Sequence, residues 1–288
     1  MNGLSVVIPV YNEGQSIGSV VRGVSSRMAM EAIPYEIIVV DDGSTDETSI
    51  VLSGLNIDKV TFVSHPYNIG YGSALKSGVD AASMDTICFF DADGQHDPED
   101  IIKLIKQVAV YAMVVGAREG YKGPVWRQPG KRLILWIAEY LVGSKIPDIN
   151  SGLRLCSKMT FNKFRHLYPR GFSLSTTITL ACLKSGLSVG YVPIHINKRE
   201  GRSTVRISDG FKTINLVLLM IMLFSPMKVF LPISMLSLVV GIISLWIDIS
   251  RTNIGDTTVL LFISAIIIFS FGLIADQLAA IRRSSVNN

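Results

Sequence analysis

The sequence predicts an α/β protein whose mainly parallel sheet is covered by helices and is followed by a two-helix transmembrane hairpin. Two observations support this. The first 210 residues alternate short β-branched runs with segments of helical spacing, which is typical of parallel sheets. The remainder is dominated by Leu, Ile, Val, Phe and Met, and no charged residue occurs between Phe230 and Ile247. The chain of 288 residues could hold one large domain or two smaller units.

The individual elements follow from local patterns. Ile17, Val20, Val21 and Val24 share one face at helical spacing, and "DPEDIIKLIKQV" starts a helix with Asp97 as N-cap and proline at the first position. The expected strands cover residues 4–11, 35–43, 60–66, 85–93 and 112–118, and the expected helices cover 13–30, 71–82 and 97–108.

Polar groups end four of these strands. They are Tyr11–Glu13 at the end of the first strand, Asp41–Asp42 at the end of the second, Asp91–Asp93 at the end of the fourth and Arg118 at the end of the fifth. In open parallel sheets, ligands bind beyond the carboxyl ends of the strands. We therefore expect these groups to converge on one rim that binds a ligand.

The acidic run "FFDADGQHDPED" raises the question of what relieves its charge repulsion. The expected fourth strand continues to Asp93, and residues two apart in a strand share a face, so the carboxylates of Asp91 and Asp93 could point to one place. Carboxylates suit Mg²⁺ or Mn²⁺, and Gln95 can add a neutral oxygen and His96 a nitrogen for Mn²⁺. The alternative, turn chemistry, suffices for the later acids of the run, which start the next helix.

A nucleotide could be bound here without a phosphate-binding loop. Asp41 or Asp42 could accept a hydrogen bond from a ribose hydroxyl or a base edge. The sequence contains neither GxGxxG nor the Walker pattern GxxxxGK[ST]. A metal-bridged diphosphate is then the remaining way to hold a nucleotide.

Four stretches together resemble a known family. "SVVIPVYNE", "YEIIVVDDGSTDET", "NIGYGSALKSG" and "FFDADGQHDPEDI" look like the family-2 glycosyltransferases, which have the GT-A fold. "VVGAR", "DINSGLRL" and "GRSTVRISDG" are similar to the polyprenyl-phosphate sugar transferases, the group that contains dolichol-phosphate mannose synthase. The resemblance covers residues 1–210, and the order of the motifs makes it specific.

The resemblance implies a set of donor-binding residues. Those expected to contact the nucleoside are Pro9, Tyr11, Glu13 and Asp42. Those expected to hold the divalent ion are Asp91, Asp93 and Gln95, with the backbone of Ala92 near the ribose. Arg202, in "GRSTVRIS", would reach the donor diphosphate from a mobile loop.

The resemblance also implies residues for the acceptor. Arg118, Lys131 and Arg132 would face the lipid phosphate, and Asp148 falls where the family places an acid near the acceptor. Lys131 and Arg132 could equally meet lipid headgroups. We expect Arg154 to pair with a structural acid and the histidines at 65, 166 and 195 to be structural.

The implied reaction is inverting transfer of a hexose from a nucleoside diphosphate to a polyprenyl phosphate, undecaprenyl or dolichyl phosphate. The ion acts as a Lewis acid on the leaving diphosphate. UDP-glucose or UDP-N-acetylglucosamine is the favoured donor, with GDP-mannose as the alternative. A processive synthase is disfavoured because the QxxRW-type motif is absent and two spans make a poor export channel. A nonenzymatic nucleotide-binding membrane adaptor is the alternative from another class.

The tail predicts a membrane anchor. Residues 227–247 and 258–275 are each long enough to cross the hydrocarbon core, and residues 211–226 predict an interfacial helix or the start of the first span. Basic residues precede the first span and follow the second. They predict that residues 1–210, the catalytic domain, lie in the cytoplasm of a prokaryote, at the plasma membrane. The start of the chain lacks signal-peptide features. We read the three cysteines as packing residues and expect no nucleic-acid partner.

Overall fold

A computed structural model describes residues 2–119, 128–171, 174–197, 218, 221–222, 225–251 and 253–285. Side chains are not described at 128–131, 133, 134 and 282–285. The chain divides into two compact units, Met1–Thr213 and Ile214–Asn288. We describe each unit by itself. The expected interfacial helix at 211–226 falls mostly outside the described residues.

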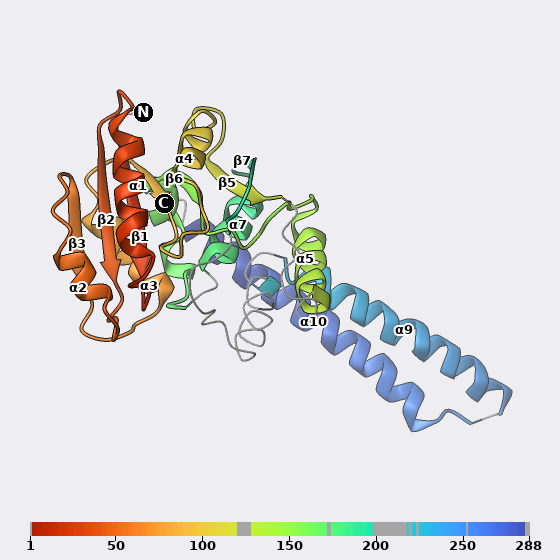
Figure 1. Ribbon diagram of the computed structural model, residues 1–288. Helices are drawn as coiled ribbons and strands as arrows, with labels where there is room; N and C mark the ends of the chain where they lie inside the picture. The colour runs from red at the N-terminus through yellow and green to blue at the C-terminus, as the bar shows by residue number, and fades with distance from the viewer. Residues whose placement is uncertain are drawn as a thin grey trace. The chain divides into compact units, whose positions relative to one another are not determined.

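The first unit is a layered α/β domain (Figure 1). Its strands are β1 Leu4–Val10, β2 Tyr35–Asp41, β3 Val60–Ser64, β4 Thr86–Phe89, β5 Met113–Arg118, β6 Arg154–Ser157 and β7 Val189–Ile194. Its helices are α1 Ile17–Ala29, α2 Thr48–Ser53, α3 Tyr71–Ala81, α4 Pro98–Ile105, α5 Gln128–Val142, α6 Lys158–Lys163 and α7 Leu174–Lys184, with a short 3₁₀ turn at Arg165–Leu167.

The seven strands form one mixed sheet in the order β3-β2-β1-β4-β6-β5-β7. All neighbours run parallel except β6, which is antiparallel to β4 and β5 and places Arg154 opposite Phe89 and Val115. The five strands and three helices expected from the sequence are confirmed, although β4 is shorter than predicted. β6 and β7 were not predicted. The single reversed strand brings the segment before Arg154 to the rim where β4 and β5 end.

Helices cover both faces of the sheet. On one face α1 packs over β2 and α4 packs over β5, β6 and β7, and Ile17, Val20, Val21 and Val24 are buried as predicted. On the other face α3 packs so closely on β1 that a Cβ at Gly78 would overlap the side chain of Val7. Asp97 caps α4, since its Oδ1 accepts the Glu99 N–H at 2.9 Å. The resulting core holds the carboxyl ends of β1, β2 and β4 along one edge.

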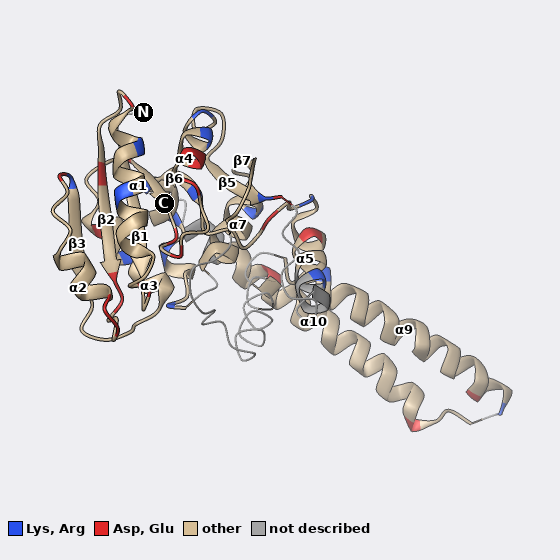
Figure 2. Ribbon diagram, in the orientation of Figure 1, with Lys and Arg blue, Asp and Glu red and all other residues tan. Residues whose placement is uncertain are grey.

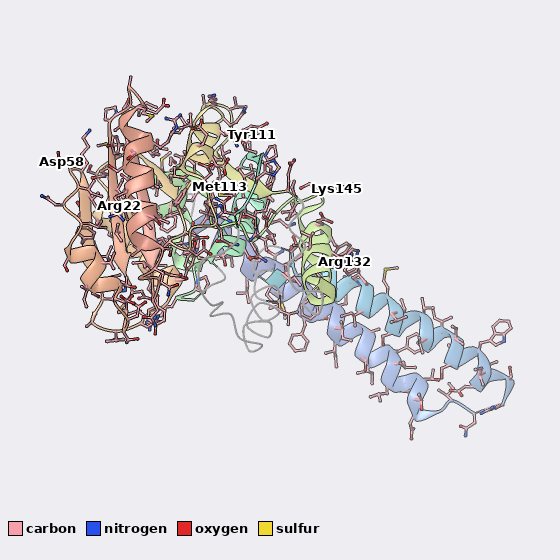
Figure 3. The ribbon with its side chains drawn as sticks, viewed as in Figure 1. Arg22, Asp58, Tyr111, Met113, Arg132 and Lys145 are labelled. Carbon is pink, nitrogen blue, oxygen red and sulfur yellow. The ribbon has the colours of Figure 1, made fainter. Side chains whose placement is uncertain are left out.

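The second unit is a helical hairpin of α9 Met227–Ser250 and α10 Asp256–Ser285. Each helix is long and apolar enough to cross a membrane, with mean hydropathy of 2.3 and 2.6 over the span. Large apolar side chains radiate outward (Figure 3), and charge is confined to the ends of the hairpin (Figure 2). The helices meet through small polar groups, because the hydroxyl of Ser234 donates to the Ala265 carbonyl at 2.8 Å and that of Ser244 lies 2.6 Å from the Thr258 hydroxyl.

Candidate active site

The loops after β1, β2 and β3 line a pocket. It has a volume of about 330 Å³ and its lining residues are Tyr11, Asp41, Gly43, Ser44, Thr45, Ser49, Ser64, His65, Pro66, Tyr67 and Asn68. Asp41 is 4% exposed, and its carboxylate accepts the Ser44 N–H at 2.9 Å and the Ser49 hydroxyl at 2.7 Å. The pocket is therefore a polar cleft with an ionisable group in its wall.

The two loops are joined to each other. Asn12, in the left-handed region at φ 54°, donates its N–H to the Ser44 hydroxyl at 3.0 Å and accepts the Thr45 N–H at 2.8 Å. The Glu13 N–H donates to the Thr48 hydroxyl at 3.0 Å. Of the expected nucleoside contacts, Pro9 is buried within β1, whereas Tyr11 lines the pocket. The loop after β1 therefore places Tyr11 in the pocket wall, whereas Pro9 lies in the buried strand before it.

Asp42 lies behind the pocket. It is 2% exposed and its oxygens accept the Ile69 and Gly70 N–H groups at 3.0 and 2.7 Å. Its Oδ1 also lies 2.7 Å from Nδ1 of His65, whose Nε2 lies 2.9 Å from the Ser77 hydroxyl. Asp42 thus holds the segment that leads into α3, and it is Asp41 that lines the pocket. His65 has structural partners that its spacing in the sequence did not reveal.

Asp91 follows β4 and is held from three sides. The Tyr71 hydroxyl donates to Oδ1 at 2.9 Å, and Nε2 of His96 lies 3.7 Å from Oδ2. Gly152 packs against the same carboxylate so closely that a Cβ there would overlap it. Enclosure of Asp91 opposes its ionisation, but His96, Tyr71 and the charge of Arg118 outweigh this and hold the pKa of the carboxyl below its usual value. Asp91 is therefore a fixed anion at the rim.

The segment after Asp91 is equally well defined. The Ala92 carbonyl accepts the Ser16 hydroxyl at 2.7 Å, and Ala92 is 4% exposed. Asp93 accepts the Gln95 N–H at 3.2 Å in a short turn, and the Gln95 carbonyl accepts the Asn197 N–H at 2.9 Å. These contacts place Asp93 and Gln95 in one tight turn directly after Asp91. The sequence predicted that the fourth strand continues to Asp93, whereas β4 ends at Phe89.

The residues of this turn fit a hard divalent cation. Two carboxylates and an amide oxygen are the donor types that Mg²⁺ and Mn²⁺ accept. Within the described part of the chain, no group of three or more His, Cys, Asp or Glu side chains is placed to hold a metal by itself. Such a set suits an ion that takes one or two protein carboxylates and completes its shell with water and substrate phosphate.

Arg118 and Asp148 form a buried, two-pronged ion pair. Arg118 donates from Nε to Oδ2 of Asp148 at 2.6 Å and from Nη2 to Oδ1 at 3.0 Å. Asp148 is 7% exposed and also accepts the Asn150 N–H at 3.1 Å. Burial opposes ionisation of Asp148, but the hydrogen bonds and charge of Arg118 hold the pKa of this carboxyl below its usual value. Asp148 is therefore a poor proton acceptor that orients a cation.

The other predicted cations are placed less fully. Arg132 is exposed on α5, whereas the side chain of Lys131 and all of Arg202 lie outside the described residues. The same exposed face carries Trp136 and Tyr140, which are 63% and 47% exposed and stack with ring centroids 6.1 Å apart. In Figure 3, Arg132 and Lys145 lie toward opposite ends of α5. This face of α5 therefore combines exposed aromatic rings with positive charge.

Three residues at the rim were not predicted from the sequence. Tyr71 contacts Asp91, Gly152 packs on it, and Arg154 is buried behind both. The expectation that Arg154 pairs with an acid is wrong for the part of the chain that is described, where its guanidinium donates only to neutral acceptors. The "SGLRL" stretch was recognised as part of a family motif. The contact of its Gly152 with Asp91, however, depends on the antiparallel β6, which was not predicted.

Comparison with known proteins agrees with this architecture. The profile of Glycosyl transferase family 2 matches residues 5–168, and that of the GtrB C-terminal hairpin matches residues 225–281. The chain belongs to glycosyl transferase family 2. Its first unit has a GT-A-like fold, and its second unit matches the GtrB C-terminal hairpin, with two helices that are long and apolar enough to cross a membrane.

Individual relatives carry related activities. The chain is 29% identical to the undecaprenyl-phosphate 4-deoxy-4-formamido-L-arabinose transferase of Enterobacter sp. (strain 638), over 68% of this chain but 60% of that protein. It is 29% identical to the polyprenol monophosphomannose synthase of Mycolicibacterium smegmatis, over 68% of this chain and 77% of that one. The match therefore covers less than two thirds of the arabinose transferase from Enterobacter, and of the one from Yersinia enterocolitica, which is also covered to 60%.

A solved structure supports the fold. The glucosyl-3-phosphoglycerate synthase of Mycobacterium tuberculosis, in complex with Mn²⁺, UDP-glucose and phosphoglyceric acid, superposes with a TM-score of 0.61 at 21% identity. The match covers 76% of this chain and 79% of that one. At this level of identity the likeness concerns the fold.

Proposed function

We propose that this protein transfers a hexose from a nucleoside-diphosphate sugar to a membrane polyprenyl phosphate, with inversion at the sugar carbon. The observation that carries the proposal is the conjunction, in one family-2 domain, of the Asp91–Gln95 turn after β4 with the Arg118–Asp148 ion pair at the end of β5, which β6 separates from β4 in the sheet. An acidic turn suits a metal-bound diphosphate, and an oriented arginine suits a second phosphate. The apolar hairpin in the same chain makes a lipid the fitting acceptor.

The donor occupies the pocket after β1 and β2. Tyr11 and Asp41 line the space for the nucleoside, while Glu13, Asp42 and the Ala92 backbone shape its surroundings. Asp91, Asp93 and Gln95 would hold Mg²⁺ or Mn²⁺. When bound, the ion supplies Lewis-acid stabilisation of the leaving diphosphate. Arg202 adds positive charge to the same group.

The acceptor phosphate is a nucleophile that is already an anion at neutral pH. It needs cations to hold it more than a base to deprotonate it, so Arg118 binds it while Asp148 orients the guanidinium. Lys131 and Arg132 add charge for the same phosphate or for neighbouring headgroups. The lowered pKa of Asp148 supports an orienting role, because a weak base is a poor proton acceptor.

Anchoring follows from the chemistry of the acceptor. Withdrawing an isoprenoid from the bilayer costs about 0.8 kcal/mol for each CH₂ that is exposed, so the reaction occurs at the membrane surface. The hairpin keeps the domain there, and exposed Trp136 and Tyr140 beside Arg132 have the composition of an interfacial face. We assign the catalytic domain to the cytoplasmic side of a prokaryotic plasma membrane.

The donor is UDP-glucose or UDP-N-acetylglucosamine. A UDP-N-acetylglucosamine–dolichyl-phosphate N-acetylglucosaminyltransferase of Methanococcus voltae, 29% identical over 215 residues, supports this class, whereas the relative named polyprenol monophosphomannose synthase supports the transfer of mannose, for which GDP-mannose is the alternative donor.

A panel assay decides between the donors. Full-length protein in detergent is incubated with Mn²⁺, undecaprenyl or dolichyl phosphate and each labelled UDP- or GDP-sugar, and the lipid phase is counted. Label from one UDP-hexose supports the proposal. Label from GDP-mannose alone would identify GDP-mannose as the donor instead of a UDP-hexose. Nucleotide binding without transfer from any donor would favour the nonenzymatic adaptor.

A further inference from the structure

Arg154 is an unusual core residue. It is 1% exposed and is the largest of the fully buried side chains among the residues that the structure describes. Its backbone lies between Phe89 of β4 and Val115 of β5, the strands that lead to Asp91 and Arg118. A charged side chain is therefore buried between the two halves of the proposed site.

The guanidinium is satisfied by neutral groups. Nε and Nη2 donate to the Ser151 carbonyl, the former at 3.2 Å, and Nη1 donates to the Ser175 carbonyl at 2.8 Å and the Thr179 hydroxyl at 3.1 Å. A buried charge of this kind is costly, and replacing it with an apolar side chain of similar size is often neutral or stabilising. Stability of the core alone therefore does not account for an arginine here.

The two carbonyls that Arg154 binds belong to the two walls around Asp91. Ser151 precedes Gly152, whose backbone packs on the Asp91 carboxylate. Ser175 lies in the first turn of α7 beside Tyr71, whose hydroxyl donates to Oδ1 of Asp91 at 2.9 Å. One planar fork thus ties together the groups that position Asp91.

We propose that Arg154 is a positioning residue that holds the 148–153 loop and α7 in register, so that Asp91 on one side and the Arg118–Asp148 pair on the other face the reacting groups at the correct separation. Arg154 touches neither substrate. This inference rests on the proposed function and adds to it a residue that acts through Ser151 and Ser175. Misplacement of reacting groups by about 1 Å can lower a rate by about 10²-fold.

The test compares Arg154→Met with Arg154→Lys in full-length protein. Arg165→Met is the matched control, because Arg165 makes an exposed pair with Asp80 at 2.5 Å outside the site. Arg154→Met is expected to lower kcat by about 10²-fold with little change in the KM for the nucleotide sugar, the signature of an effect on the reacting arrangement. Arg154→Lys, which keeps the charge, is expected to recover part of this loss, and the control to behave as wild type.

Hydrogen–deuterium exchange of the same proteins gives a readout that is independent of transfer. Amides of 149–153 are expected to exchange faster in Arg154→Met, while those of β1 and β2 stay protected. A folded Arg154→Met with wild-type kcat, or with unchanged exchange in this loop, would overturn the inference. If Arg154→Met does not fold, the Lys variant decides: wild-type kcat and wild-type exchange would overturn the inference, and a lower kcat together with faster exchange in this loop would support it. If wild type itself transfers no sugar, the proposed function fails, and exchange still tests the positioning.

Discussion

Gly152 offers a sharp test of the site geometry. A Cβ at this position would overlap all three atoms of the Asp91 carboxylate group, which the Tyr71 hydroxyl holds at 2.9 Å. Gly152→Ala must therefore move either the loop or Asp91. Overpacking of this kind costs about 1–3 kcal/mol. A displaced carboxylate also lowers the transfer rate, by about 10²-fold for a shift of 1 Å.

The assay measures both effects in parallel. The midpoint temperature of thermal unfolding should fall by about 2–4 °C for each kcal/mol of unfolding free energy that is lost. Transfer of labelled sugar to polyprenyl phosphate should fall far more than this loss of folded protein explains. Gly171→Ala is the control, because no atom of the residues that the structure describes lies within 4 Å of a Cβ there. Wild-type transfer by Gly152→Ala would refute the argument that Asp91 must stay where Gly152 leaves room for it.

Three further predictions follow from described contacts. Asp148→Asn should lower the free energy of unfolding by about 3–5 kcal/mol at pH 7, since it breaks a buried pair. Because the folded pKa of Asp148 is lowered, this stability is present above its unfolded pKa of about 3.9 and is lost as pH falls through the folded pKa, so a pH-independent difference from wild type would contradict the account. Ser234→Leu should destabilise the hairpin in thermal unfolding in detergent, unlike Ser250→Leu on an exposed face; equal effects would disprove the packing. Trp136→Ser should raise the KM for a long-chain acceptor in vesicles and leave the KM for a short, water-soluble acceptor unchanged. Met159→Ser, which alters an exposed side chain elsewhere, should change neither KM. Equal changes in the two KM values of Trp136→Ser would argue against an interfacial α5.

Much of this site could be predicted because it follows strand ends. A β-branched run followed by acids identifies the end of β4, and the helix signal at Asp97 separates Asp91 and Asp93 from the acids that serve α4. The hairpin was equally clear, because uncharged apolar runs of this length have few alternatives. Both signals are local in sequence.

The remaining features depend on contacts between distant segments. β6 has four residues and no distinctive periodicity, so its antiparallel insertion could not be predicted, and with it the burial of Arg154 and the contact of Gly152 with Asp91. Asp41 and Asp42 are adjacent aspartates that the sequence does not distinguish. Only the folded structure shows that the Asp42 carboxylate contacts His65. Residue type identified the rim, whereas long-range packing assigns each side chain its place.

The most direct test of the central claim is metal-dependent transfer to lipid by matched acid variants. Wild type, Asp93→Asn and Asp58→Asn, the last changing an exposed acid labelled in Figure 3, are reconstituted in vesicles with polyprenyl phosphate and a labelled UDP-hexose. The account predicts lipid-bound label for wild type and Asp58→Asn, abolished by chelator and restored by Mn²⁺, and little label for Asp93→Asn. Transfer by Asp93→Asn at the wild-type rate, or transfer that persists in chelator, would contradict it.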